Sequence, residues 1–153
     1  HDHAAAEAAW GALADLPASA VGGAATRAAS LLRAHVLEMR GKAQAAQGRD
    51  LEALSSFEAA LKLAPQRAAL WRQLAHSQGR AGLADAAARS WRRAVALAPD
   101  DVATLEARWE LAHLYVVTGQ VMLALGELRR IISRDDGPLG AKARLMSLQL
   151  ELR

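Results

Sequence analysis

The feature that most constrains the fold of this chain is an internal repeat with a period of 34 residues. Residues 60–65 read Ala-Leu-Lys-Leu-Ala-Pro, and residues 94–99 read Ala-Val-Ala-Leu-Ala-Pro. The same offset relates Phe57 to Trp91. A period of this size is typical of stacked supersecondary units, because a single unit cannot bury its own apolar face. The sequence therefore predicts an array of repeated units.

A third copy follows at an offset of 37 residues, which relates Gly82 to Gly119 and Ala87 to Ala124. Three additional residues must therefore lie after Pro99. Each copy is predicted to form two helices. The first helix ends at a glycine, which adopts a left-handed conformation at little cost, and the second ends at or near a proline, which cannot continue a helix. These punctuating residues are Gly48, Gly82, Gly119, Pro65, Pro99 and, less regularly, Pro138.

The composition independently favours helices. The 153 residues include 38 alanines and 24 leucines but only one Phe, one Tyr and four Trp. Alanine and leucine are strong helix formers, whereas the aromatic and β-branched residues that favour strands are scarce. We therefore predict an all-α fold. The chain has no cysteine, which excludes disulfides, zinc-thiolate sites and thiol catalysis.

The middle copy resembles the tetratricopeptide repeat (TPR), a helix-turn-helix unit with a Trp, a Leu, a small residue, an Ala, an aromatic residue and a Pro at set positions. The small residue lies where the two helices of a unit cross, and Gly41, Ala75 and Ala112 occupy this position in the three copies. The resemblance covers residues 34–138. It implies a right-handed superhelix of antiparallel helix pairs. The matching residues of the middle copy are Trp71, Leu74, Ala75, Ala87, Trp91 and Pro99.

The predicted units span residues 34–67, 68–101 and 105–138. Residues 1–33 are expected to hold an N-terminal helix over residues 4–13 and the start of an extended entry helix. The N-terminal helix loosely resembles the second helix of a degenerate repeat. Residues 139–153 are expected to form a C-terminal helix. This last helix carries more large apolar side chains than one face can bury. We therefore expect it either to dock deeply on the array or to contact a partner or a second copy of the chain.

The resemblance implies that the first helix of each unit lines a concave groove that binds peptides. The expected groove is basic in its centre, with Trp109 as an apolar anchor unless the C-terminal helix buries it. The alternative is an ordinary solvated face. The absence of Asn and the presence of Glu110 argue against a site for a C-terminal carboxylate. The predicted partner-binding residues are His35, Glu38, Lys42, Arg72, His76, Glu106, Trp109 and His113.

Several functional classes are disfavoured by the sequence. The serines lie in helical segments without a nucleophile elbow, and no Gly-rich phosphate loop is present, so we predict neither catalysis nor a cofactor. His35, His76 and His113 come from three helices without ligand spacing, so no metal site is expected. The net charge is only +3 with acids and bases interspersed, which argues against nucleic acid. No apolar run is long enough to span a membrane.

The sequence thus predicts a non-catalytic scaffold that binds a peptide or helical segment of a partner protein. The alternative is a docking or regulatory domain of a larger enzyme, or of a secretion or assembly complex subunit. A helical RNA-binding repeat is a weaker third option. The Ala- and Arg-rich composition is typical of bacterial proteins, and both cytoplasm and periplasm are compatible with it.

Overall fold

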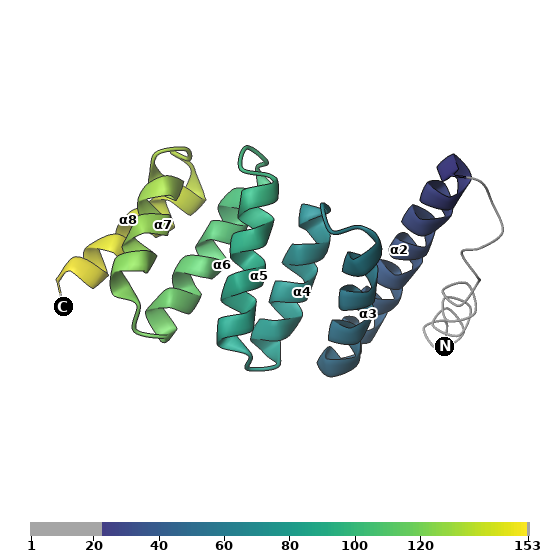
Figure 1. Cartoon of the computed structure of the whole chain (residues 1–153). Helices are drawn as coiled ribbons and strands as arrows, with labels where there is room; N and C mark the ends of the chain where they lie inside the picture. Colours follow the sequence, from purple (N-terminus) through teal and green to yellow (C-terminus); the bar gives the residue numbers. More distant parts are fainter. Residues whose placement is uncertain (1–22, 153) are drawn as a thin grey trace.

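The structure of the protein, a computed structural model, describes residues 23–152, which form seven helices and no strand (Figure 1). The predicted helix over residues 4–13 lies outside the described residues. The all-α architecture confirms the predicted fold class. The helices are α2 (Gly23–Ala46), α3 (Asp50–Leu63), α4 (Ala68–Arg80), α5 (Ala84–Leu97), α6 (Ala103–Val117), α7 (Val121–Ile132) and α8 (Pro138–Glu151).

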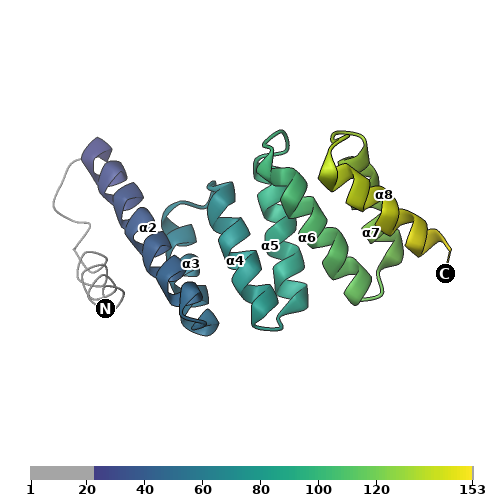
Figure 2. The same ribbon diagram turned by 180° about the vertical axis from the view of Figure 1, so that it is seen from behind.

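The helices pack as sequential antiparallel pairs, α2 with α3, α4 with α5 and α6 with α7, and α8 packs against α7. Helices α3, α5 and α7 lie toward the viewer in Figure 1, and helices α2, α4, α6 and α8 lie toward the viewer in Figure 2. We call these two sides the second-helix face and the first-helix face. The 24-residue α2 extends well before the first unit, as the sequence predicts.

Three glycines end the first helix of each pair with the same geometry. Gly48, Gly82 and Gly119 have φ angles of +75°, +76° and +74°. In each case the N–H of the next residue donates to the carbonyl five residues earlier, at 2.9, 2.9 and 2.7 Å. This bond satisfies a carbonyl that the helix end would otherwise leave free. The predicted ends of the three first helices are confirmed, whereas α7 ends at Ile132 and Pro138 begins α8.

Small residues allow the two helices of each pair to cross closely. Gly41 is buried on α2, and a Cβ atom at this position would lie 2.7 Å from the ring of Phe57 on α3. Ala75 and Ala112 occupy the corresponding positions of α4 and α6 and are fully buried. On the second helix of each pair, a large side chain fills the core beside this crossing. Phe57 of α3 and Leu128 of α7 are both fully buried.

Two buried polar pairs occupy matching positions in the first two units. The Ser56 hydroxyl donates to Gln44 Oε1 at 2.6 Å, and the Ser90 hydroxyl donates to Gln78 Oε1 at 2.7 Å. Both glutamines stand where the repeat commonly has an apolar residue or Tyr. A buried amide oxygen without a hydrogen-bond donor would lower the stability of the fold. The serine twelve residues later supplies that donor.

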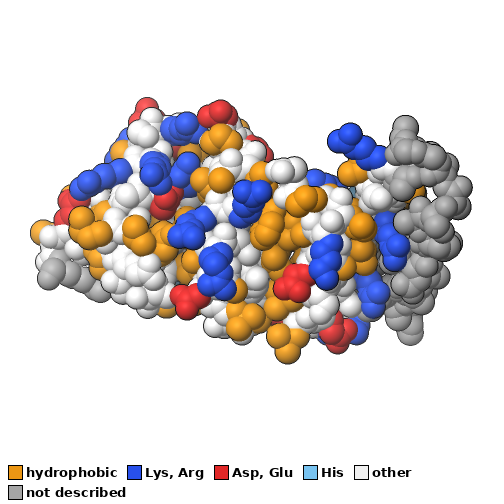
Figure 3. Space-filling view, in the orientation of Figure 1, with side chains coloured by type: hydrophobic (Ala, Val, Ile, Leu, Met, Phe, Trp, Pro, Cys, Tyr) orange, Lys and Arg blue, Asp and Glu red, His pale blue; other side chains and the backbone are white. Residues whose placement is uncertain are grey.

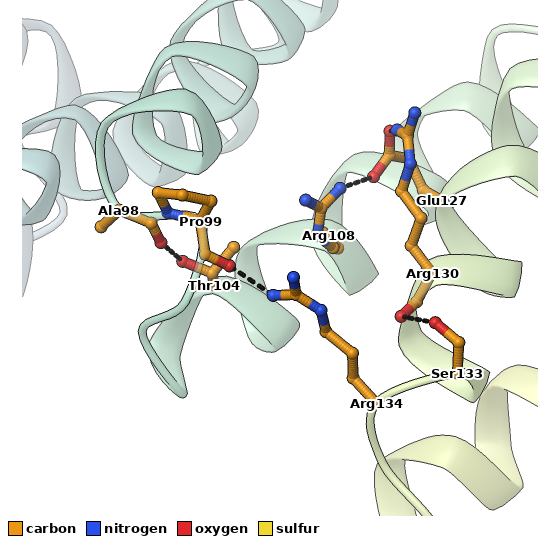
Figure 4. A network of polar contacts seen from close by, with 8 residues as sticks. All are labelled: Ala98, Pro99, Thr104, Arg108, Glu127, Arg130, Ser133 and Arg134. Carbon is orange, nitrogen blue, oxygen red and sulfur yellow. Dashed lines mark hydrogen bonds and ion pairs between the residues drawn. The ribbon is translucent and has the colours of Figure 1, made fainter.

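The third unit replaces this pair with an ion pair (Figure 4). Arg108 of α6 lies 2.6 Å from a carboxylate oxygen of Glu127 on α7, and both side chains are only 11% exposed. Arg130 binds the other carboxylate oxygen of Glu127. Arg108 stands where the second unit has Trp71. A charged residue at an apolar position is therefore tolerated because the facing helix carries its counter-ion.

The three inserted residues change the junction between α5 and α6. The loop between α3 and α4 comprises residues 64–67, whereas residues 98–102 connect α5 to α6, so one inserted residue lies in the loop. The other two extend α6 at its N-terminal end. The Thr104 hydroxyl donates to the Ala98 carbonyl, and Arg134 donates to the Pro99 carbonyl at 2.7 Å (Figure 4). These bonds tie the longer loop to α6 and to the turn that follows α7.

Candidate functional site

Two cavities lie side by side between α4 and α6 on the first-helix face. The larger has a volume of about 480 Å³ and is lined by four of the predicted partner-binding residues. Leu139 of α8 also lines it. The array thus gathers side chains that are more than 30 positions apart in the sequence. The four residues are Arg72, His76, Glu106 and Trp109.

The smaller cavity has a volume of about 270 Å³ and shares His76 with the larger one. His113 and Glu110 line it from α6, and Arg80 lines it from α4. The structure therefore brings five of the eight predicted residues into one continuous region. We call the two cavities together the α4–α6 groove.

The three predicted residues of α2 lie elsewhere, and the prediction for Glu38 is wrong. The Glu38 side chain is only 4% exposed, because Lys42 at 2.6 Å and Arg67 at 2.9 Å hold its carboxylate. His35 lies 3.8 Å from the same group. Glu38 is thus a buried anchor for cations of α2 and the loop before α4, and it is not presented to a partner. The exposed His35 and the half-buried Lys42 remain accessible.

The groove does not have the expected basic centre. Arg72 forms an ion pair with Asp101 at 3.4 Å, which compensates its charge. Glu106 and Glu110 are exposed, and neither forms an ion pair with any residue in the described range 23–152. The α6 side of the groove therefore carries two uncompensated carboxylates. Its electrostatic preference is for a basic group.

Trp109 is shared between the core and the groove. It is half-buried and packs against the same buried cluster as Leu139, Met146 and Leu150 of α8. Part of the ring also lines the larger cavity. Trp109 thus packs on a core that α8 helps to form, and it also contributes to the wall of the larger cavity. An indole held by packing is a rigid apolar contact surface.

Trp91 and Leu139 are two large apolar residues among the groove residues that the sequence interpretation missed. Trp91 of α5 is 8% exposed and lines both cavities, although it belongs to a second helix. Phe57 and Leu128 occupy the same repeat position as Trp91. The indole of Trp91 is the largest of the three side chains, and its size could have indicated that it reaches beyond the core to the groove. Leu139 could not be found from the repeat, because it belongs to the helix that follows the last unit.

Within residues 23–152, no cluster of three His, Cys, Asp or Glu side chains could hold a metal ion. None of the described helices combines the length and apolarity needed to cross a bilayer.

Comparison with known proteins gives a structural answer only. No model of a known protein family matches the sequence, and no curated protein is similar to it. Among solved structures, the N-terminal domain of stress-induced protein-1 from C. elegans is similar with a TM-score of 0.70, 17% identity and coverage of 80% of this chain and 97% of that one. The first TPR of Spaghetti (RPAP3), bound to an HSP90 peptide, is similar with a TM-score of 0.66, 18% identity and coverage of 78% and 90%.

The Yersinia enterocolitica type III secretion translocator chaperone SycD is also similar, with a TM-score of 0.65, 17% identity and coverage of 78% of this chain and 92% of that one. These structures are TPR proteins, so the chain has the TPR fold over about 78% of its length. The predicted resemblance is confirmed at the level of the fold.

Proposed function

We propose that this chain is a non-catalytic scaffold that binds a segment of a partner protein in the α4–α6 groove. The observation that carries this proposal is the pair of adjoining cavities, with the half-buried Trp109 in the wall of the larger one. Rigid aromatic rings in concave sites are frequent binding hot spots. The TPR of RPAP3 binds a peptide, which supports the same use of this fold here. We place the units at residues 34–67, 68–101 and 105–138.

The charges of the groove suggest the chemistry of the partner. Glu106 and Glu110 favour a Lys or Arg, and Trp109 favours an adjacent apolar side chain. The ligand we propose is therefore a segment in which a basic residue neighbours an apolar one. A C-terminal carboxylate fits poorly, because the chain has no Asn and the two glutamates would repel it.

Substitutions in the groove test this proposal. Trp109→Ala and Glu106→Lys are each expected to weaken partner binding by more than about 1 kcal/mol, because each removes a contact at the centre of the groove. Partners are first captured from the native cell on the immobilised chain and identified by mass spectrometry. Their dissociation constants are then measured by calorimetry for the parent and for both variants.

Arg92→Ala is the matched control for these variants. Arg92 is exposed on α5, lines neither groove cavity and forms no ion pair within the described range. Its removal is expected to change affinity by less than about 0.5 kcal/mol. A partner whose binding needs Arg92 but neither Trp109 nor Glu106 would place the binding surface on the second-helix face and contradict the proposal.

An alternative function is docking or regulation within a larger enzyme, or within a secretion or assembly complex. The chaperone SycD, which has the same fold, supports the second form of this alternative. The groove and its ligand would be the same in either case. The length and content of the complete open reading frame distinguish an isolated scaffold from a docking domain.

The outer face of α8 supports an additional contact. Leu145, Leu148 and Leu152 are 60%, 58% and 86% exposed, and their spacing places them on one side of the helix. The opposite side, with Ala143 and Ser147, is buried against the array. We propose that the exposed leucines pair with those of a second copy of this chain.

Sedimentation velocity tests this self-association. Leu148→Glu is expected to shift the protein toward the monomer at concentrations of roughly 100 μM without lowering its melting temperature, because the side chain is already exposed. Leu150→Glu is the matched control. Leu150 packs against the buried cluster that includes Leu128 and Ile131, so this variant should lower the melting temperature instead. A parent protein that stays monomeric throughout would exclude the proposed contact.

A further inference from the structure

A third large cavity lies outside the α4–α6 groove, on the second-helix face between α3 and α5. Its volume is about 590 Å³, which exceeds that of either groove cavity and suits a small ligand or one or two side chains. Trp71 and Leu74 of α4 form its floor, and Leu61 and Ala86 line its sides. Figure 3 views this face and shows apolar surface near the middle of the molecule, bordered by Lys and Arg side chains.

The rim of this cavity carries an excess of positive charge. Lys62 contributes from α3, and Arg89 and Arg93 contribute from α5. All three are exposed, and none forms an ion pair with another residue of the described part of the chain. Glu58 is the acid that lines the same cavity. The rim therefore presents three cations against one carboxylate, next to an apolar floor.

Comparison of the units shows why these cations are available. The 37-residue offset relates Arg93 to Arg130 and Ser90 to Glu127. In the third unit, Glu127 binds Arg130 internally. In the second unit, Ser90 carries no charge and donates its hydroxyl to Gln78, so Arg93 keeps no internal counter-ion. A cation that is compensated in one unit is thus free in the other.

The same comparison explains the apolar floor. Trp71 stands where the third unit has Arg108, which is held by Glu127. The Trp71 ring is fixed in the second unit by a 2.8 Å hydrogen bond from its Nε1 to the Pro65 carbonyl. In the first unit, Ala59 replaces the cation at the position of Arg93. Only the second unit therefore combines an apolar floor with an uncompensated cation at these positions.

We propose that this cavity is a second protein-binding site, specific for a segment in which an apolar side chain is flanked by carboxylates. The apolar side chain occupies the floor over Trp71, and the carboxylates pair with Lys62 on one side and Arg93 on the other. Glu58 on the rim and the small number of cations disfavour nucleic acid, which requires a continuous basic track. Because α4 separates this cavity from the α4–α6 groove, the chain can hold two different segments at once.

A pair of short peptides tests the proposal on the full chain. The first is a fluorescein-labelled peptide with a central Leu flanked by two Glu on each side, and the second has Gln in place of every Glu. Fluorescence anisotropy is expected to show binding of the acidic peptide and at least about ten-fold weaker binding of the Gln peptide, a difference of about 1.4 kcal/mol. Arg93→Glu should weaken binding of the acidic peptide by a similar factor.

Arg92→Glu is the matched control, because Arg92 neighbours Arg93 on α5 but does not line the cavity. It changes the net charge equally and is expected to alter binding by less than about two-fold. Trp109→Ala should have no effect, which separates this site from the proposed function of the groove. Circular dichroism of each variant establishes that it is folded.

Three results would overturn the proposal. The first is a parent chain that does not bind the acidic peptide. The second is an equal loss with Arg92→Glu and Arg93→Glu, which would indicate unspecific attraction to a basic surface. The third is binding to phosphatidylserine vesicles or to a single-stranded oligonucleotide that depends on Arg93 and that the acidic peptide does not displace.

Discussion

Glu127→Ala is expected to lower the free energy of unfolding by roughly 3 kcal/mol, the largest effect we predict for a single residue. The carboxylate of Glu127 is the one ion-pair partner of Arg108 within residues 23–152, and both side chains are 11% exposed. The Nε atom of Arg108 is buried without a hydrogen-bond partner. Removal of Glu127 leaves a largely buried guanidinium uncompensated, which typically costs about 3–5 kcal/mol. Urea unfolding followed by circular dichroism measures the change.

A set of exchanges between units provides the control. Arg108→Trp, Tyr115→Gln and Glu127→Ser together give the third unit the residues that the second unit has at Trp71, Gln78 and Ser90. In the second unit these residues have hydrogen-bond partners and no buried charge. The triple variant should therefore recover most of the stability that Glu127→Ala loses. A loss of less than about 1 kcal/mol in Glu127→Ala would show that solvent compensates Arg108 and that the ion pair is not required.

Gly140→Ala is expected to cost on the order of 2 kcal/mol and to loosen α8. A Cβ atom at this position would overlap the backbone carbonyl oxygen of Asp135. The Asp135 carboxylate also accepts hydrogen bonds from the N–H groups of Gly137, at 3.1 Å, and Gly140, at 2.6 Å. The first turn of α8 must therefore shift away from the loop that caps it. Overpacking of this kind typically costs about 1–3 kcal/mol.

Gly126→Ala is the matched control for this substitution. Gly126 also lies within a helix, but a Cβ atom there meets no other atom within 4 Å. This variant should be more stable than the parent by up to about 1 kcal/mol, because alanine restricts the unfolded chain and favours the helix. Tryptophan fluorescence should change in Gly140→Ala alone, since Trp109 packs against the buried cluster that includes Ala143 of α8. Equal stability of the two variants would contradict the described docking of α8.

The sequence predicted the helix ends and the helix crossings, because each depends on one residue type at a fixed position of the repeat. Gly48, Gly82 and Gly119 mark helix ends because a positive φ angle is tolerated there by glycine at little cost. The crossing positions were predicted because close approach of two helices admits only Gly or Ala. Five of the eight predicted residues line one groove because α4 and α6 are neighbours, and the repeat places Arg72 and Trp109, and likewise His76 and His113, at matching positions of these two helices.

The contacts made by the loops that follow α3 and α5 were not predicted from the repeat. The burial of Glu38 depends on Arg67, which comes from the loop after α3, and the compensation of Arg72 depends on Asp101 in the longer loop before α6. Both partners lie about 29 residues away, in segments where the repeat is least regular. A residue pattern shows which face a side chain occupies, but it does not show which loop returns to that face.

The two residues added to the start of α6 bear on how such an array can diversify. They make residue 103 helical, whereas the corresponding residue 66 before α4 lies in a loop. Ala103 consequently forms part of the wall of the larger groove cavity. A duplicate of residues 68–101 inserted in place of the third unit would preserve every packing position and still lack this wall. In this chain the length of the junction between α5 and α6, as well as the identity of the side chains, determines the shape of the larger groove cavity.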